Sequence, residues 1–98
     1  MNFKIFNSDS KSGARTGELK LNNIKVKTPF FMPVCTNGTP KGIDIKTLDL
    51  IGYEVIVCNA YHLFLRPGSD YIKNSFGSLH RFSGWSKGIL TDSGGFQI

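Results

Sequence analysis

The first third of the chain alternates between apolar and polar residues. Apolar positions recur at every second residue, at Phe3, Ile5, Leu19, Leu21, Ile24 and Val26. This period is typical of strands that bury one face and expose the other. Asn22-Asn23 is a two-residue turn candidate, because asparagine tolerates the positive φ that tight hairpins require. The pattern predicts a small antiparallel sheet over residues 1–28.

The pattern changes at Pro29. Residues 30–35 and 55–58 are almost continuously apolar, and residues 89–91 form a third apolar stretch. Runs of this kind are typical of strands buried on both faces, as in parallel α/β sheets. Pro33 donates no hydrogen bond to a sheet, so it indicates a bulge or an early end of the first of these strands.

Helix signals separate the apolar runs. Asp44 is a favourable N-cap and Gly52 suits the left-handed residue after a helix, so a short helix is expected between them. A second helix is expected over residues 69–76, with Ser69 as its cap and Gly77 as its end. The sequence therefore predicts an antiparallel sheet followed by β-α-β-α-β.

Composition indicates a globular α/β chain with room for one modest core. The 98 residues are 40% hydrophobic, 12% aromatic and 19% charged, which excludes disordered and fibrous classes. No apolar run approaches the roughly 20 residues of a membrane helix, and residues 1–12 do not resemble a signal peptide. A cytoplasmic location without a membrane partner is the expectation. Cys35 and Cys58 are too few for a zinc site, which needs about four ligands. They are expected to be buried and free, and the alternative of one disulfide between them is disfavoured in a reducing compartment.

The net charge of +5 is unevenly distributed. Residues 1–27 hold six basic side chains against two acidic ones, whereas residues 28–98 hold six against five. A basic N-terminal sheet attracts polyanions such as RNA. The alternative is a solvated sheet whose edge lysines discourage aggregation. From charge alone, this second interpretation is favoured.

Polar segments follow all three apolar runs, at residues 36–39, 59–62 and 92–97. In parallel α/β folds, ligands bind beyond the carboxyl ends of the strands. Asp92 leaves a buried strand, two glycines then expose backbone N–H groups, and Phe96 offers a flat face. Together these groups suit a planar heterocycle with ring nitrogens. The alternative is a turn in which Asp92 only accepts backbone hydrogen bonds.

Three segments resemble signatures of the tRNA-guanine transglycosylase family: FFMPVCTNGTPKG (30–42), CNAYHLFLRPG (58–68) and ILTDSGGFQI (89–98). Their order and spacing match across essentially the whole chain, and the second segment is similar to the bacterial and eukaryotic queuosine-type enzymes. The resemblance implies a TIM (β/α)8 barrel with an added antiparallel sheet. Residues 1–98 would form the N-terminal part of one catalytic domain, with the sheet at 1–28 and the first three barrel strands with their connecting helices at 29–98.

The resemblance also implies a reaction. Members of the family are pentosyltransferases that exchange guanine at the tRNA wobble position for a 7-deazaguanine base in queuosine biosynthesis. The base is 7-aminomethyl-7-deazaguanine in bacteria and queuine in eukaryotes. The exchange is a double displacement through a covalent tRNA–enzyme intermediate. The partners implied are tRNA and this base, with a homodimer or heterodimer in the full-length protein.

The family's nucleophilic aspartate and its structural zinc site belong to later parts of the family sequence. No cofactor is therefore expected in residues 1–98, and this segment alone is expected to be inactive. The alternatives are a non-catalytic accessory homologue and a small RNA-binding α/β module.

Several positions match the family's functional residues. Asp92 matches the general acid–base aspartate, and Asn59 matches a residue of the base pocket. The residues carried over as substrate-binding are Asp92, Ser93, Gly94, Gly95, Phe96 and Asn59. In the family, Phe96 would stack on the purine-like ring. Cys35 stands where a glycine is usual and Ala60 where a threonine is usual; both are expected near the pocket, where they would affect base selectivity.

Overall fold

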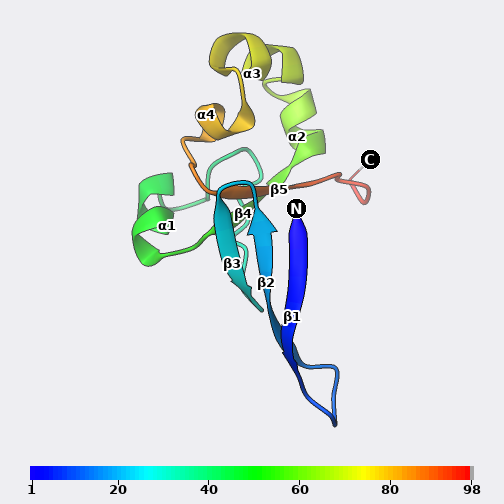
Figure 1. Ribbon diagram of the computed structural model, residues 1–98. Helices are drawn as coiled ribbons and strands as arrows, with labels where there is room; N and C mark the ends of the chain where they lie inside the picture. The colour runs from blue at the N-terminus through cyan, green and yellow to red at the C-terminus, as the bar shows by residue number, and fades with distance from the viewer. Residues whose placement is uncertain (98) are drawn as a thin grey trace. The chain divides into compact units, whose positions relative to one another are not determined.

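The computed structural model describes residues 1–97, which form a mixed α/β structure. The chain divides into two compact units, Met1–Phe31 and Met32–Ile98. Figure 1 shows three adjacent strands in the first unit, and two strands with four helices in the second. Within residues 1–97, no helix combines the length and the apolar character needed to cross a membrane.

The first unit is a three-stranded antiparallel sheet in the order β1-β2-β3. Its strands are β1 (Asn2–Ser8), β2 (Arg15–Leu21) and β3 (Ile24–Thr28), so the predicted sheet is confirmed. Leu21 pairs with Ile24 around the predicted turn. The reason given for that turn was wrong, because no non-glycine residue among 1–97 has a positive φ. The turn therefore belongs to neither of the two types with positive φ at a central residue.

The two faces of this sheet differ in chemistry. Leu19 pairs with both Phe3 and Val26 on the apolar face. Val26 is only 1% exposed, whereas Ile5 on β1 is 54% exposed. The expectation of a half-buried sheet is therefore wrong for β1, which is exposed along its whole length. Within this unit β1 is an edge strand with one paired neighbour, so fewer side chains cover it.

The second unit is built on a parallel pair, β4 (Val55–Asn59) and β5 (Gly88–Asp92). Both strands were predicted, and both are confirmed. The predicted strand at 30–35 is reduced to an isolated parallel bridge between Val34 and Val57. Beside it, Cys35 N donates to Val57 O at 2.7 Å, and Val57 N donates to Pro33 O at 2.9 Å. Pro33 has no N–H to extend the ladder, which explains why this strand is so short.

Four helices accompany these strands: α1 (Ile45–Ile51), α2 (Ala60–Leu65), α3 (Ser69–Phe76) and α4 (Leu79–Ser83). The predicted ends of α1 are confirmed. Asp44 accepts a hydrogen bond from Thr47 N at 2.8 Å, and Gly52 has a φ of 107°.

The remaining helices correct the predicted order. The range of α3 is as predicted, but Gly68 occupies the N-cap position and Ser69 is the first helical residue. Neither α2 nor α4 was predicted, because each is under two turns long and shows no clear helical period. Three helices rather than one therefore lie between β4 and β5.

The core of the second unit gathers side chains from its strands and helices. Its buried members are Cys35, Leu48, Ile56, Cys58, Leu63, Ile72 and Trp85. Both cysteines are buried and free, as expected. No pattern in the sequence predicted the burial of Trp85, whose indole N–H donates to Gly88 O at 2.9 Å. This bond ties the tryptophan to the first residue of β5.

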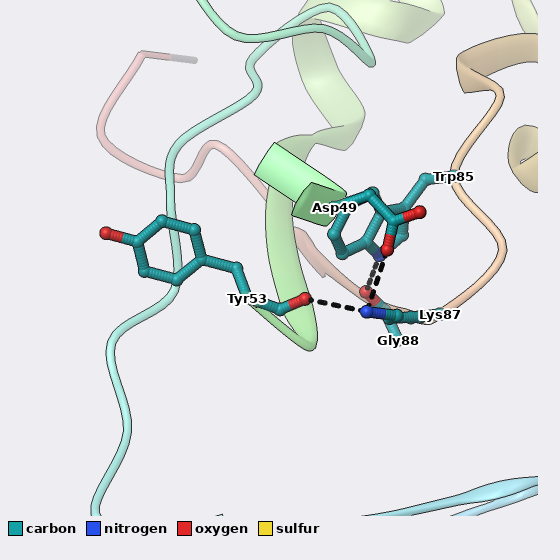
Figure 2. A network of polar contacts seen from close by, with 5 residues as sticks. All are labelled: Asp49, Tyr53, Trp85, Lys87 and Gly88. Atoms are coloured by element: carbon teal, nitrogen blue, oxygen red, sulfur yellow. Dashed lines mark hydrogen bonds and ion pairs between the residues drawn. The ribbon is translucent and has the colours of Figure 1, made fainter. Parts of the chain in front are cut away.

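A polar network around Lys87 also holds the start of β5 (Figure 2). Lys87 Nζ lies 2.8 Å from Asp49 Oδ1 and donates to Tyr53 O at 3.4 Å. The ammonium also lies 5.7 Å from the centre of the Trp85 ring. Since Lys87 and Asp49 are both partly exposed, the ion pair is worth less than about 1 kcal/mol. The contacts of Lys87 matter more for position than for stability, because they connect α1 and the chain just before β4 to the start of β5.

Candidate active site

The candidate site begins at the carboxyl ends of β4 and β5. Asn59 and Asp92 are register partners there, the last pair of the parallel ladder. Residues directly opposite in paired strands project to the same face of a sheet. The structure therefore brings Asn59 and Asp92 to one edge and one face, as the sequence analysis expected of residues that follow adjacent strands.

The third polar strand end lies beside them. Asn59 N donates to Thr36 O at 3.1 Å, and Gly38 N donates to Cys35 O at 2.9 Å. Residues 33–36, which carry the isolated bridge and are called the bridge segment, therefore end close to β4, and β4 ends beside β5. Ligand sites of parallel α/β sheets form at such edges.

Asn59 has a structural task of its own at this edge. Its Oδ1 accepts a hydrogen bond from His62 N at 3.1 Å and caps α2. The side chain is only 8% exposed, the one buried polar side chain of the described residues. A buried cap held from both β4 and α2 gives the asparagine a fixed orientation.

Gly94 lies directly against this capped asparagine. A methyl group at Gly94 would come within 2.8 Å of Asn59 Oδ1 and within 2.7 Å of Tyr61 Cβ. Its φ is +70°, a conformation that residues with a side chain rarely adopt. Both constraints require glycine here. The predictions did not include Tyr61, and its place beside Asn59 in the 58–68 segment was the only available signal.

The loop after β5 is folded by two local hydrogen bonds. Asp92 Oδ1 accepts from Gly94 N at 3.2 Å, and Gln97 N donates to Gly94 O at 3.0 Å. The bond from Gly94 N is of the kind expected if Asp92 served only as a turn residue that accepts backbone hydrogen bonds. Within residues 1–97 no hydrogen bond reaches Asp92 Oδ2, and the side chain is exposed. One carboxylate oxygen orients the loop and the other is available to a ligand.

The other residues of this loop face solvent. Ser93 and Gly95 are exposed, and Phe96 is 100% exposed. The structure brings Asp92, Asn59 and Gly94 together, but no side chain of residues 1–97 covers the Phe96 ring. The stacking role of Phe96 stays a prediction.

The two cysteines lie behind the site rather than in it. Burial raises the pKa of the Cys58 thiol to about 11, and the neighbouring Cys35 adds to this rise. Burial likewise raises the pKa of Cys35. Thiols with raised pKa values stay protonated at neutral pH and are poor nucleophiles and poor metal ligands. Cys35 packs in the core instead of lining the open edge, while Ala60 is exposed as the first residue of α2.

Within the part of the chain that the structure describes, no three histidine, cysteine or carboxylate side chains are grouped so as to hold a metal ion. The resemblance places the family's structural zinc site in later parts of the family sequence, and that expectation stays a prediction.

A pocket of about 230 Å³ lies elsewhere in the second unit, with an almost wholly apolar lining. Its walls are Ala60, Leu63, Phe64, Ser69, Ile72, Leu79 and Thr91. Neither Asn59 nor Asp92 lines it. Thr91 precedes Asp92 in β5, and successive residues of a strand face opposite ways. The pocket thus belongs to the helix-packed side of β5 rather than to the candidate site.

Comparison with known proteins identifies the family to which this chain belongs. A family model described as "Queuine tRNA-ribosyltransferase" matches residues 9–98. The chain belongs to the queuine tRNA-ribosyltransferase family, whose members are transferases named for acting on tRNA.

Relatives from several bacteria carry the same name. A Queuine tRNA-ribosyltransferase of Treponema denticola is 54% identical over 96 residues, covering 98% of this chain and 25% of the relative. The protein of that name from Acidovorax sp. is 50% identical over 98 residues, covering 100% of this chain and 25% of the relative. The protein of that name from Borrelia hermsii is 50% identical over 96 residues, covering 98% of this chain and 25% of the relative. The chain spans about a quarter of the length of these relatives.

Proposed function

We propose that the intact protein carrying this chain exchanges guanine at the wobble position of tRNA for a 7-deazaguanine base. The observation that carries the proposal is the Asn59–Asp92 register pair, with Gly94 packed against the asparagine. It holds a carboxylate at the open edge of a parallel sheet, in a chain that belongs to a family named for ribosyl transfer to tRNA. The cytoplasm, where tRNA is available, is the proposed location.

In this proposal Asp92 is the general acid and base. An aspartate from a later part of the chain attacks C1′ of the ribose, and the bond between C1′ and guanine breaks. Guanine departs poorly as an anion, so a proton from Asp92 lowers the barrier. The resulting Asp92 carboxylate then accepts a proton from the entering base, which attacks C1′ and releases the enzyme carboxylate. The covalent intermediate divides one difficult step into two.

The remaining residues hold the base. Gly94 and Gly95 leave the backbone of the loop accessible to a planar ligand, since neither carries a side chain. Phe96 has its ring free to stack on the base. Asn59 orients the loop through its contact with Gly94. The parallel order of the bridge segment, β4 and β5, with helices between them, supports their place as the first strands of a (β/α)8 barrel.

Replacement of Asp92 tests this assignment. Asp92→Asn keeps the acceptor of the turn bond to Gly94 N but has no titrating proton. In the intact enzyme we expect the exchange of labelled guanine into tRNA to fall by about 10² to 10⁴, with an unchanged thermal midpoint. The matched control is Asp70→Asn, which removes an exposed carboxylate on α3 and should leave exchange intact.

Exchange rate and thermal midpoint together distinguish a general acid–base role of Asp92 from a role as a turn residue. A stably folded Asp92→Asn enzyme with near-normal exchange would show that Asp92 is a turn residue only. An intact wild-type protein that binds tRNA without exchanging guanine would instead be the accessory homologue.

A further inference from the structure

The register of the first unit places four of its six basic residues on one face of the sheet. Lys4 pairs with Glu18, which pairs with Lys27 across β2 and β3. In the next row Asn2 pairs with Lys20, which pairs with Lys25. Paired residues share a face and alternate residues along a strand share it too. We call this surface the lysine face: Asn2, Lys4, Glu18, Lys20, Lys25 and Lys27.

The positive charge of the lysine face is only partly compensated. It holds four lysines and one glutamate, and all four lysines are exposed. None of them forms an ion pair with a residue of the described chain. Lys20 and Lys25 lie directly opposite each other, and like charges in that arrangement destabilise a sheet. A sheet that serves only as a scaffold gains nothing from this pair.

Protection against aggregation explains only part of this arrangement. Lysines that discourage association lie on edge strands, as Lys4, Lys25 and Lys27 do on β1 and β3. Lys20 lies on the central strand β2, both of whose edges are already paired. It has no edge to protect, yet it completes a cluster with the lysines of both neighbours. A cluster of flexible ammonium groups is what a polyanionic ligand requires.

We propose that the lysine face binds the phosphate backbone of tRNA. This inference rests on the proposed function, since it takes tRNA as the polyanion. Lysine is a point charge without the planar fork that reads base edges, so the contact adds affinity without sequence selectivity. Chemistry on the wobble base is assigned to the carboxyl ends of β4 and β5, and the lysine face contributes to holding the substrate.

The test neutralises the lysine face in the intact protein. The variant carries Lys4→Gln, Lys20→Gln, Lys25→Gln and Lys27→Gln. The matched control carries Lys11→Gln, Lys41→Gln, Lys46→Gln and Lys73→Gln, which remove the same charge from other exposed positions. Binding of an unmodified tRNA transcript is measured against salt concentration. Each lost phosphate contact lowers the slope of log Kd against log salt by about one, so the variant should lose about two to four.

Steady-state kinetics give a second measurement. We expect the KM for tRNA to rise about tenfold with kcat within about twofold, because the contact binds ground state and transition state equally. A third variant with all four lysines of the face changed to arginine keeps the charge and should restore the salt slope. It also shows whether substitution at these positions impairs folding.

The outcomes separate this inference from the proposed function. Wild-type exchange together with equal salt slopes for the glutamine variant and its control would overturn the lysine face alone. Self-association of the glutamine variant, with unchanged tRNA binding, would overturn it in favour of edge protection. A wild-type protein that neither binds tRNA nor exchanges guanine would overturn both.

Discussion

The two compact units are stabilised in different ways. In the first, Val26 is the one buried apolar side chain among the described strand residues, and the sheet depends on its backbone ladders. In the second, side chains from the bridge segment, β4 and the helices α1, α2 and α3 enclose a common core. Burial of apolar surface is the larger source of stability. The second unit is therefore expected to be the more resistant to substitution at its surface and the more sensitive in its interior.

This difference corresponds to the two kinds of chemistry assigned to them. Proton transfer needs a carboxylate held within about 0.5 Å of its productive position, which a packed core and a capped strand end provide. Attraction of a polyanion acts over about 8–10 Å and tolerates flexible side chains. An exposed sheet with lysines on one face meets that weaker requirement. The two proposed functions therefore match the rigidity of the unit in which each is placed.

The largest expected effect comes from matched truncations in the two units. Ile56→Ala removes a side chain that is 0% exposed in the core, whereas Ile5→Ala removes one that is 54% exposed on β1. The first should lower the free energy of unfolding by about 2–5 kcal/mol, and the second by less than about 1 kcal/mol. Urea unfolding of the intact protein measures both. Equal losses would mean that the first unit has a core comparable to that of the second.

A smaller effect is expected where the loop meets the capped asparagine. Gly94→Ala places a methyl group against Asn59 and Tyr61 at a φ of +70°. It should cost about 1–3 kcal/mol in stability and, by displacing Asp92, about 10² in exchange rate. Gly95→Ala is the stability control, since its methyl group would meet only Ser93 Oγ at 3.8 Å. If both variants melt with the wild type, the Gly94 contact does not constrain the loop.

Signals confined to a few neighbouring residues predicted their structures well. Asp44 and Gly52 give the two ends of α1 because capping is a local hydrogen-bond problem. Alternation predicted the pairing of β2 with β3, although not the φ values of the turn between them. The polar residues after β4 and β5 predicted the edge where Asn59 and Asp92 lie side by side.

Contacts between distant residues could not be predicted from the pattern. Whether Gly94 packs on Asn59 depends on the path of the chain through three helices, two of which are too short to show a period. The burial of Trp85 and its bond to Gly88 likewise depend on how α4 returns to β5. The first apolar run was expected to form a strand with a bulge or an early end at Pro33, and it forms a single bridge. The apolar character of a segment indicates burial more reliably than it indicates ladder length.

The smallest effect is a pH dependence at the N-terminus of α1. Hydrogen bonds from the Thr47 side chain and backbone hold the pKa of Asp44 below its ordinary value of 3.8. The Thr47 hydroxyl donates to Asp44 Oδ1 at 2.6 Å. Because the folded-state pKa is depressed, this stabilisation is fully present above the unfolded pKa. It is lost as the pH falls through the folded-state pKa.

Asp44→Asn keeps a capping oxygen but does not titrate. The advantage of the wild type in thermal midpoint over this variant should therefore be constant above the ordinary pKa of 3.8 and shrink as the pH falls below it, through the lower folded-state pKa. Thr47→Val removes the hydroxyl, which makes the largest contribution to the shift, and should weaken the pH dependence while leaving Asp44 in place. A wild-type advantage that stays constant as the pH falls below 3.8 would show that Asp44 acts as a cap through its shape alone and not through its charge.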